Sequence, residues 1–147
     1  MRYDTIIKSY AERLGMGFMH ERWEMANVKA DKPDVDYPLL VFVMPATGRL
    51  TIDFGLNVLD EPQCLFAFLT PTERMDYDGE EGAPPLEQMK SKMLAFINAI
   101  NTSGDFEPLN GEIEYQTIFH RLDRDSMGVM FEARLTPTRG ECLADYE

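Results

Sequence analysis

One stretch of the chain keeps an unbroken helical period. Apolar side chains recur between residues 84 and 104 at steps of three and four, at Leu86, Met89, Met93, Phe96, Ile97 and Ile100. Pro84 and Pro85 suit a first turn, where a missing N–H has no helical acceptor. Gly104 suits the left-handed position after a last turn. The pattern predicts a long amphipathic helix that begins at Pro84-Pro85, ends by Gly104 and lays its apolar stripe on a sheet.

A shorter helical pattern opens the chain. Its apolar positions are Ile6, Ile7, Tyr10, Ala11 and Leu14. Asp4 is a residue type that caps helix starts, and Gly15 provides a stop. Residues 17–28 keep neither the helical nor the strand period cleanly, and we expect a strand there. The charged residues 29–36 include a proline and predict a loop.

Three further runs predict strands. Residues 39–44 are continuously apolar between Tyr37-Pro38 and Pro45, which indicates a strand buried on both faces. Residues 49–58 alternate, with Leu50, Ile52, Phe54, Leu56 and Val58 on one side, and predict a single half-buried antiparallel strand. Residues 59–62 then form a connection, and residues 64–69 form an apolar strand.

The carboxyl-terminal part alternates twice more. Residues 112–119 and 129–135 predict the two strands of a long hairpin with a charged tip, preceded by a turn at Asn110-Gly111. Residues 137–147 predict a loose tail. The fold class is therefore α+β: a mainly antiparallel sheet with an N-terminal helix and one long amphipathic helix packed on it, ending in a β-hairpin. We expect a single domain over residues 1–136 and a C-terminal tail over residues 137–147.

Charge and composition narrow the class of function. The chain has 147 residues with a net charge of −12, and this sign opposes direct binding to nucleic-acid phosphates. Cys64 and Cys142 lack paired spacing, which favours reduced thiols of a cytosolic protein and leaves one long-range disulfide open. The amino terminus lacks a signal-peptide core, and no apolar run approaches the roughly 20 residues of a membrane span. We expect folding in a cytoplasm and no membrane partner.

The acidic turn at residues 75–82 is the most suggestive chemical feature. With Asp76 at position one of a calcium loop, Asp78, Glu80 and Glu87 fall at ligand positions three, five and twelve. Glu81, however, stands where that loop needs glycine. A solvated acidic loop is therefore favoured over a calcium site, and no metal ligand is assigned.

No catalytic constellation stands out elsewhere. The two histidines, His20 and His120, have no partner at metal-ligand spacing, and no nucleophile motif accompanies them. Gly15-Met16-Gly17 lacks the third glycine and the preceding strand of a dinucleotide site. The ten methionines suit core filling or, for some, a subunit contact. The sequence predicts a protein that is not an enzyme and needs no cofactor.

Three stretches together carry a resemblance to a known group of proteins. They are YPLLVFVMP, CLFAFLTPTERMDYDGEEG, and the helix ending that continues as FINAINTSGDFEPLNGEIEYQTIFHRLDRDSMGVMFEARL. Over roughly residues 37–136, this order resembles tail terminator, tail completion and neck (head-to-tail connector) proteins of tailed bacteriophages and prophages, particularly of Bacteroidetes-type hosts. Related sequences tend to carry Thr-Gly-Val where this chain has Met127-Gly128-Val129.

The resemblance implies a structural protein of the virion tail or neck, made in the host bacterial cytoplasm. It implies a homo-oligomeric ring, commonly a hexamer, that contacts neighbouring tail-tube or head-connector proteins and performs no turnover. An acidic lumen would let DNA pass without specific binding. The best candidates for contacts are the loop at residues 29–36, the acidic turn and the charged hairpin tip, with Asp76, Asp78, Glu80, Glu81, Asp123, Arg124 and Asp125 as candidate interface residues.

Two alternatives stay open. The first is a small cytosolic adaptor or regulatory protein-binding domain encoded by a phage or mobile element. The second is an enzyme that uses the acidic turn with a metal ion.

Overall fold

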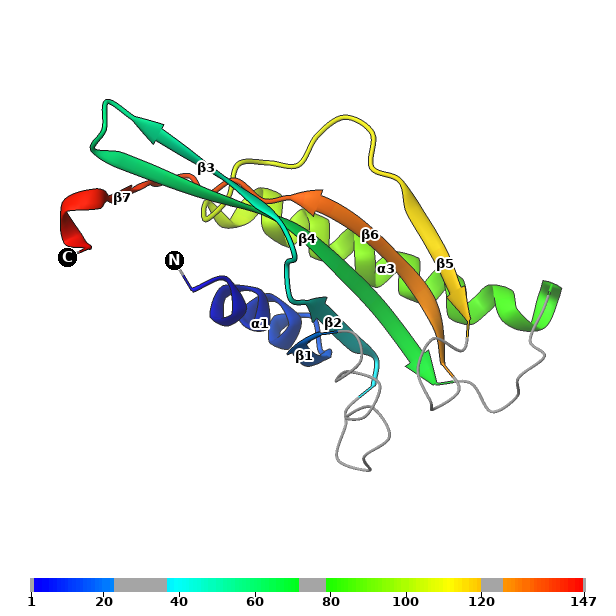
Figure 1. The fold of residues 1–147 in the computed structure, drawn as a ribbon. Helices are drawn as coiled ribbons and strands as arrows, with labels where there is room; N and C mark the ends of the chain where they lie inside the picture. The colour runs from blue at the N-terminus through cyan, green and yellow to red at the C-terminus, as the bar shows by residue number, and fades with distance from the viewer. Residues whose placement is uncertain (1, 23–36, 72–78, 120–125, 147) are drawn as a thin grey trace.

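A curved sheet with two helices forms the body of the protein (Figure 1). The computed structural model describes residues 2–22, 37–71, 79–119 and 126–146. In chain order the elements are α1 (Tyr3–Arg13), β1 (Gly17–Glu21), β2 (Leu39–Val43), β3 (Gly48–Asp53), β4 (Asn57–Pro71), α3 (Gly79–Ser103), β5 (Tyr115–Phe119), β6 (Ser126–Arg134), β7 (Glu141–Cys142) and the short 3₁₀ helix η1 (Leu143–Asp145).

Five strands form the row β1-β2-β4-β6-β5, while β3 and β7 pair with the first part of β4. β1 runs parallel to β2, and the other described pairings are antiparallel. The mixed α+β class with a mostly antiparallel sheet, an N-terminal helix and one longer helix is therefore confirmed. The final hairpin is confirmed as β5 paired with β6, in the register Tyr115 opposite Phe131.

The main core lies between the sheet and the two helices. Phe96 of α3 is fully buried, and its ring centroid lies 4.8 Å from that of Phe66 and 5.4 Å from that of Phe68. Tyr10 of α1 adds an edge-on contact to Phe96 at 6.3 Å. The predicted stripe on α3 is confirmed, because Met89, Met93, Phe96 and Ile100 all belong to this core. Aromatic packing of this kind is a large source of stability.

A second, smaller apolar cluster occupies the opposite face of the sheet. Its buried members alternate along the same strands with those of the main core, as the period of two requires. They are Met19, Leu39, Val41, Ala67, Leu69 and Ile118. Strand β2 is thus buried on both faces, as its continuous apolar sequence predicted.

The prediction of one strand over residues 49–58 is wrong. The chain turns at Phe54-Gly55-Leu56, with the Leu56 N–H donating to the Asp53 carbonyl at 3.0 Å, so this stretch is the tip of a β3–β4 hairpin. Asp53 pairs with Asn57 and Ile52 with Val58. Residues with even numbers therefore face even-numbered partners, and the alternation continues through the turn as though the strand were unbroken. The expected connection at residues 59–62 is instead part of the 15-residue β4.

Three smaller expectations also need correction. Asp4 lies inside the first turn of α1 and pairs with Arg2 at 2.9 Å, so it is not the cap. Helix α3 begins at Gly79, and Pro84 and Pro85 lie inside it. The tail after Pro137 is not loose, because Pro137 bridges to Phe106 and β7 pairs with β4.

Candidate interaction surface: the β3–β4 arm

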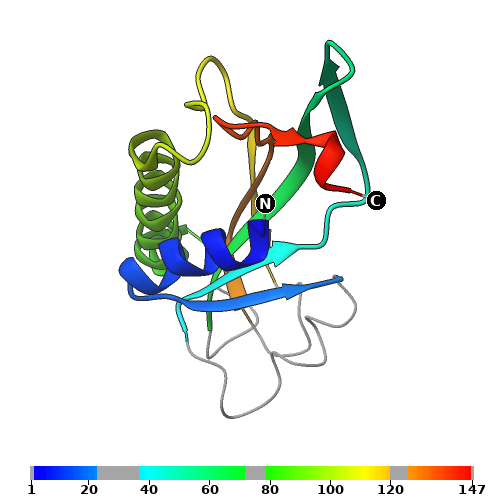
Figure 2. The same ribbon diagram turned by 90° about the vertical axis from the view of Figure 1, so that its left-hand side faces the viewer.

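The β3–β4 hairpin projects beyond the helix-covered part of the sheet (Figures 1 and 2). We call residues 48–60 the arm. Its side chains are mostly exposed: the pattern along β3 is exposed at every position except Thr51. Apolar side chains nevertheless dominate the even-numbered positions, and the exposed ones are Leu50 at 63 %, Ile52 at 52 %, Phe54 at 98 % and Leu56 at 60 %. Clustered exposed apolar groups of this kind mark contact surfaces.

Phe54 at the arm tip is held in an unfavourable backbone conformation. Its φ of 53° lies in the left-handed region, and the following Gly55 has φ 68°. Glycine adopts this region freely, whereas a bulky aromatic residue rarely does. A ring that is 98 % exposed gains little from packing within its own chain. An aromatic residue at this position is therefore a candidate contact residue.

Glu61 anchors the arm to the body. This glutamate is only 4 % exposed and lies opposite Arg49, where β3 begins alongside β4. Its carboxylate accepts hydrogen bonds from Arg49 Nη2 at 2.9 Å, Thr51 Oγ1 at 2.7 Å and Thr136 Oγ1 at 2.9 Å. The hydrogen bond from the Arg49 guanidinium, followed by those from the two threonines, lowers the pKa of Glu61 to about 2. The ionised carboxylate thus joins β3, β4 and the chain after β6.

Two further contacts fix the arm on either side. The Tyr3 hydroxyl of α1 donates to the backbone carbonyl of Asp60. On the other side, the Leu143 N–H donates to the Leu56 carbonyl at 2.7 Å, and Asn57 pairs with Cys142 of β7. The arm is therefore braced by the first helix and by the carboxyl-terminal segment.

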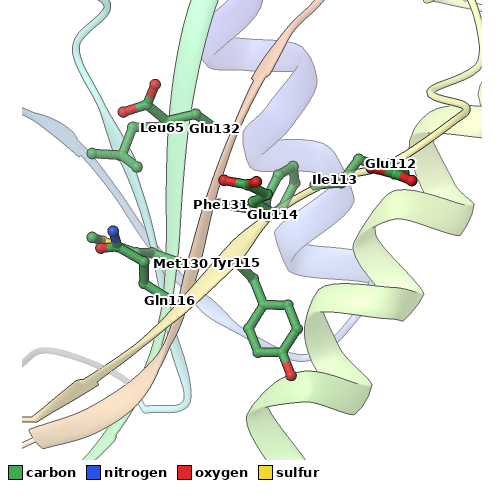
Figure 3. A pocket seen from close by; sticks show the side chains of 9 residues that line it. All are labelled: Leu65, Glu112, Ile113, Glu114, Tyr115, Gln116, Met130, Phe131 and Glu132. Atoms are coloured by element: carbon green, nitrogen blue, oxygen red, sulfur yellow. The ribbon is translucent and has the colours of Figure 1, made fainter.

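One groove lies between β6 and the segment that leads into β5, residues 112–114 (Figure 3). This β5–β6 groove has a volume of about 310 Å³, and its lining includes Leu65 and Met130. Glu112, Glu114 and Glu132 also line it. Three carboxylates give it a negative potential that disfavours an acidic occupant.

A second groove of about 560 Å³ lies between the end of α1 and the middle of α3, at the far end of β4 from the arm. We call it the α1–α3 groove. Its described lining residues are Gly15, Pro38, Thr70, Gln88, Met89, Ser91, Lys92 and Ala95. Among them only Lys92 is charged, and its Nζ donates to the Leu14 carbonyl at 2.7 Å.

A third groove, of about 420 Å³, lies at the root of the arm and includes His20 and Asp4. The His20 ring stacks on Phe42 at 4.3 Å, with Nδ1 2.9 Å from the Phe42 carbonyl. These two contacts fix the His20 ring against β2.

The predicted interface residues are only partly placed by the structure. Glu80 and Glu81 lie in the first turn of α3. The others lie outside the described residues: Asp76, Asp78, Asp123, Arg124, Asp125, and with them the loop at residues 29–36 and His120. Within the described part of the chain, no group of three or more His, Cys, Asp or Glu side chains is arranged to hold a metal ion.

The two cysteines are free and differ in environment. Cys142 is exposed, and Cys64 is buried in β4, where burial raises the pKa of its thiol to about 12. A disulfide between them, which the sequence left open, is not formed. None of the described helices combines the length and apolarity of a membrane span.

Sequence reasoning missed the arm, although Asp53 and Gly55 are typical turn residues and signalled its tip. The comparisons with known proteins add no assignment for this surface. No protein-family model matches the chain, and no significant match was found among curated proteins or among solved structures.

Proposed function

We propose that this protein is a structural subunit that assembles with copies of itself into a ring at the tail end or head–tail neck of a tailed phage. The observation that carries the proposal is the arm, which projects from a well-packed body and exposes Leu50, Ile52 and Phe54. Contiguous apolar groups on a projecting hairpin favour a role in assembly. In this proposal the chain supplies contacts and no turnover chemistry.

The charge of the chain supports a passage that does not retain DNA. A net charge of −12 repels phosphates, so a ring of such subunits lets DNA slide through without being held. The edge strands of the described sheet also favour assembly. β1 and β5 end the main row, and β3 pairs only with β4 among the described strands. An edge strand can pair with a strand of another copy.

The test combines assembly with location. Native mass spectrometry of the purified protein over a range of concentrations should give a discrete closed oligomer, and mass spectrometry of purified virions should detect the chain. Absence of the chain from virions would overturn the proposal. A pull-down that returns one host protein and no virion component would instead identify an adaptor.

A further inference from the structure

We propose that Phe54 at the arm tip inserts into the α1–α3 groove of a second copy of this chain, with Asp53 of the arm facing Lys92 of the groove. This inference rests on the proposed function and specifies the contact by which the ring forms. The two surfaces lie at opposite ends of β4, because Asn57 begins this strand next to the tip and Thr70 near its end lines the groove.

Phe54 has the properties of an inserted side chain. It is 98 % exposed, and its backbone φ of 53° is strained for an aromatic residue. The α1–α3 groove has the matching properties: a volume of about 560 Å³ and a lining that includes Pro38, Met89 and Ala95. Buried aromatic anchors in such pockets supply much of the binding energy of protein interfaces.

Charge decides between the grooves. Asp53 is exposed and comes directly before Phe54. In the β5–β6 groove this carboxylate would meet Glu112, Glu114 and Glu132, and like charges oppose such a contact. The groove at the arm root is lined by Asp4 and Asp60, and its cation, Arg2, already pairs with Asp4 at 2.9 Å. In the α1–α3 groove, Lys92 is the one charged side chain among the described lining residues, and it has the opposite sign to Asp53.

Placement at opposite ends gives the assembly its form. A tip on one copy and a groove on the next make a head-to-tail contact, in which two different surfaces meet. Repetition of a head-to-tail contact generates a ring when the rotation closes. A second copy as occupant thus agrees with the proposed ring, whereas a face-to-face dimer would need the same surface on both partners.

Two variants test the two halves of the contact. Phe54→Asn removes the phenyl group from the arm tip, and asparagine is compatible with the left-handed backbone at this position. Ala95→Trp fills the groove. Each variant alone should raise the dissociation constant of the oligomer by at least about 30-fold, as expected for a dominant interface residue. Native mass spectrometry should then show monomers. An equimolar mixture should give a 1:1 heterodimer, because the first variant retains a groove and the second retains a tip.

Charge reversal provides the second test and a control for folding. Asp53→Lys and Lys92→Glu should each weaken the oligomer, and the double variant should recover it, which a purely structural role of either residue would not produce. Leu94→Ala removes another exposed apolar side chain, 62 % exposed and outside the groove lining, and should leave the oligomer unchanged. Circular dichroism verifies that each variant is folded.

The outcomes separate this contact from the proposed function. If the oligomer persists in folded Ala95→Trp but is lost in Phe54→Asn, the arm tip is a contact but the α1–α3 groove is not its binding site. A ring that persists in both would reject the whole contact. A wild-type monomer at all concentrations would also overturn the contact, while the presence or absence of the chain in virions decides the function independently.

Discussion

Strand β4 passes through two different environments, and the contrast separates the residues that stabilise the fold from those that we propose contact another copy. In the body, Phe66, Ala67, Phe68 and Leu69 are all fully buried. In the arm, Asn57 and Asp60 of the same strand are exposed. The body buries large side chains on both faces, whereas the arm is held by hydrogen bonds to α1, to the chain after β6 and to the carboxyl-terminal segment, and leaves apolar groups in water. Substitutions in the body should therefore change folding, and substitutions in the arm should change assembly.

The largest effect is expected at Phe96. This fully buried ring contacts Tyr10, Phe66, Phe68 and Phe131. Phe96→Ala should destabilise the fold by about 3–5 kcal/mol, because it removes apolar burial and leaves a cavity. Leu94→Ala on the same helix is the matched control, since Leu94 is 62 % exposed and its loss should change stability by less than about 0.5 kcal/mol. Denaturant unfolding measures both, and equal losses would contradict the packing described.

The next comparison is between the stability costs of replacing one glycine in the body, Gly128, and one in the arm, Gly55. In the body, a Cβ on Gly128 would lie 1.8 Å from the Phe68 carbonyl oxygen, so the strands must move apart to admit it. Gly128→Ala should cost at least about 1–3 kcal/mol, the usual range for overpacking. In the arm, Gly55→Ala meets no atom within 4 Å and is disfavoured only by φ +68°, at about 1 kcal/mol. Thermal unfolding should rank Gly128→Ala as the more damaging change.

The environment of Glu61 at the root of the arm indicates that the stability of the fold depends on pH. The pKa of Glu61 is about 2 in the folded chain, below its ordinary value of 4.5, because Arg49, Thr51 and Thr136 donate to the carboxylate. A lowered folded pKa stabilises the fold above the unfolded pKa, and this stabilisation is lost as the pH falls towards the folded pKa. Glu61→Gln should therefore unfold more readily than wild type at pH 7, and the gap should narrow between about pH 5 and pH 2. A gap in melting temperature that stays constant with pH would refute this role.

The smallest effect should have the opposite sign. Phe54→Asn relieves the left-handed strain at φ 53° and loses almost no packing, because the ring is 98 % exposed. It should stabilise the isolated subunit by about 1 kcal/mol. The same variant should weaken assembly, so one substitution changes the two properties in opposite directions. A loss of stability, measured by denaturant unfolding of the monomer, would show that the Phe54 side chain packs within its own chain.

The body was largely predictable from sequence, because its patterns reflect burial. The stripe through Met89, Met93 and Phe96, the apolar run of β2 and the alternation of β6 each follow from one repeating geometry. The start of α3 was not predictable, since Pro84 and Pro85 favour a first turn and yet lie inside the helix.

The arm was missed for a specific reason. Its strands pair Ile52 with Val58, so the apolar period of two continues through the turn, and alternation alone cannot distinguish this hairpin from one long strand. Glu61 could not be identified because its donors include Thr136, far along the chain. The predicted contact residues Asp76, Asp78, Asp123, Arg124 and Asp125 lie outside the described residues, and their role stays a prediction.

Because β4 is one continuous strand, the arm tip is joined rigidly to the core of the protein and not through a flexible linker. The 15 residues of β4, at about 3.3 Å each, span roughly 50 Å of uninterrupted strand from the turn into the core. A tip fixed in this way has little conformational freedom to lose when it docks, which favours tight binding from a small contact area. Because the arm and the central strand of the sheet are the same strand, β4, a displacement of the tip also moves the part of β4 within the core.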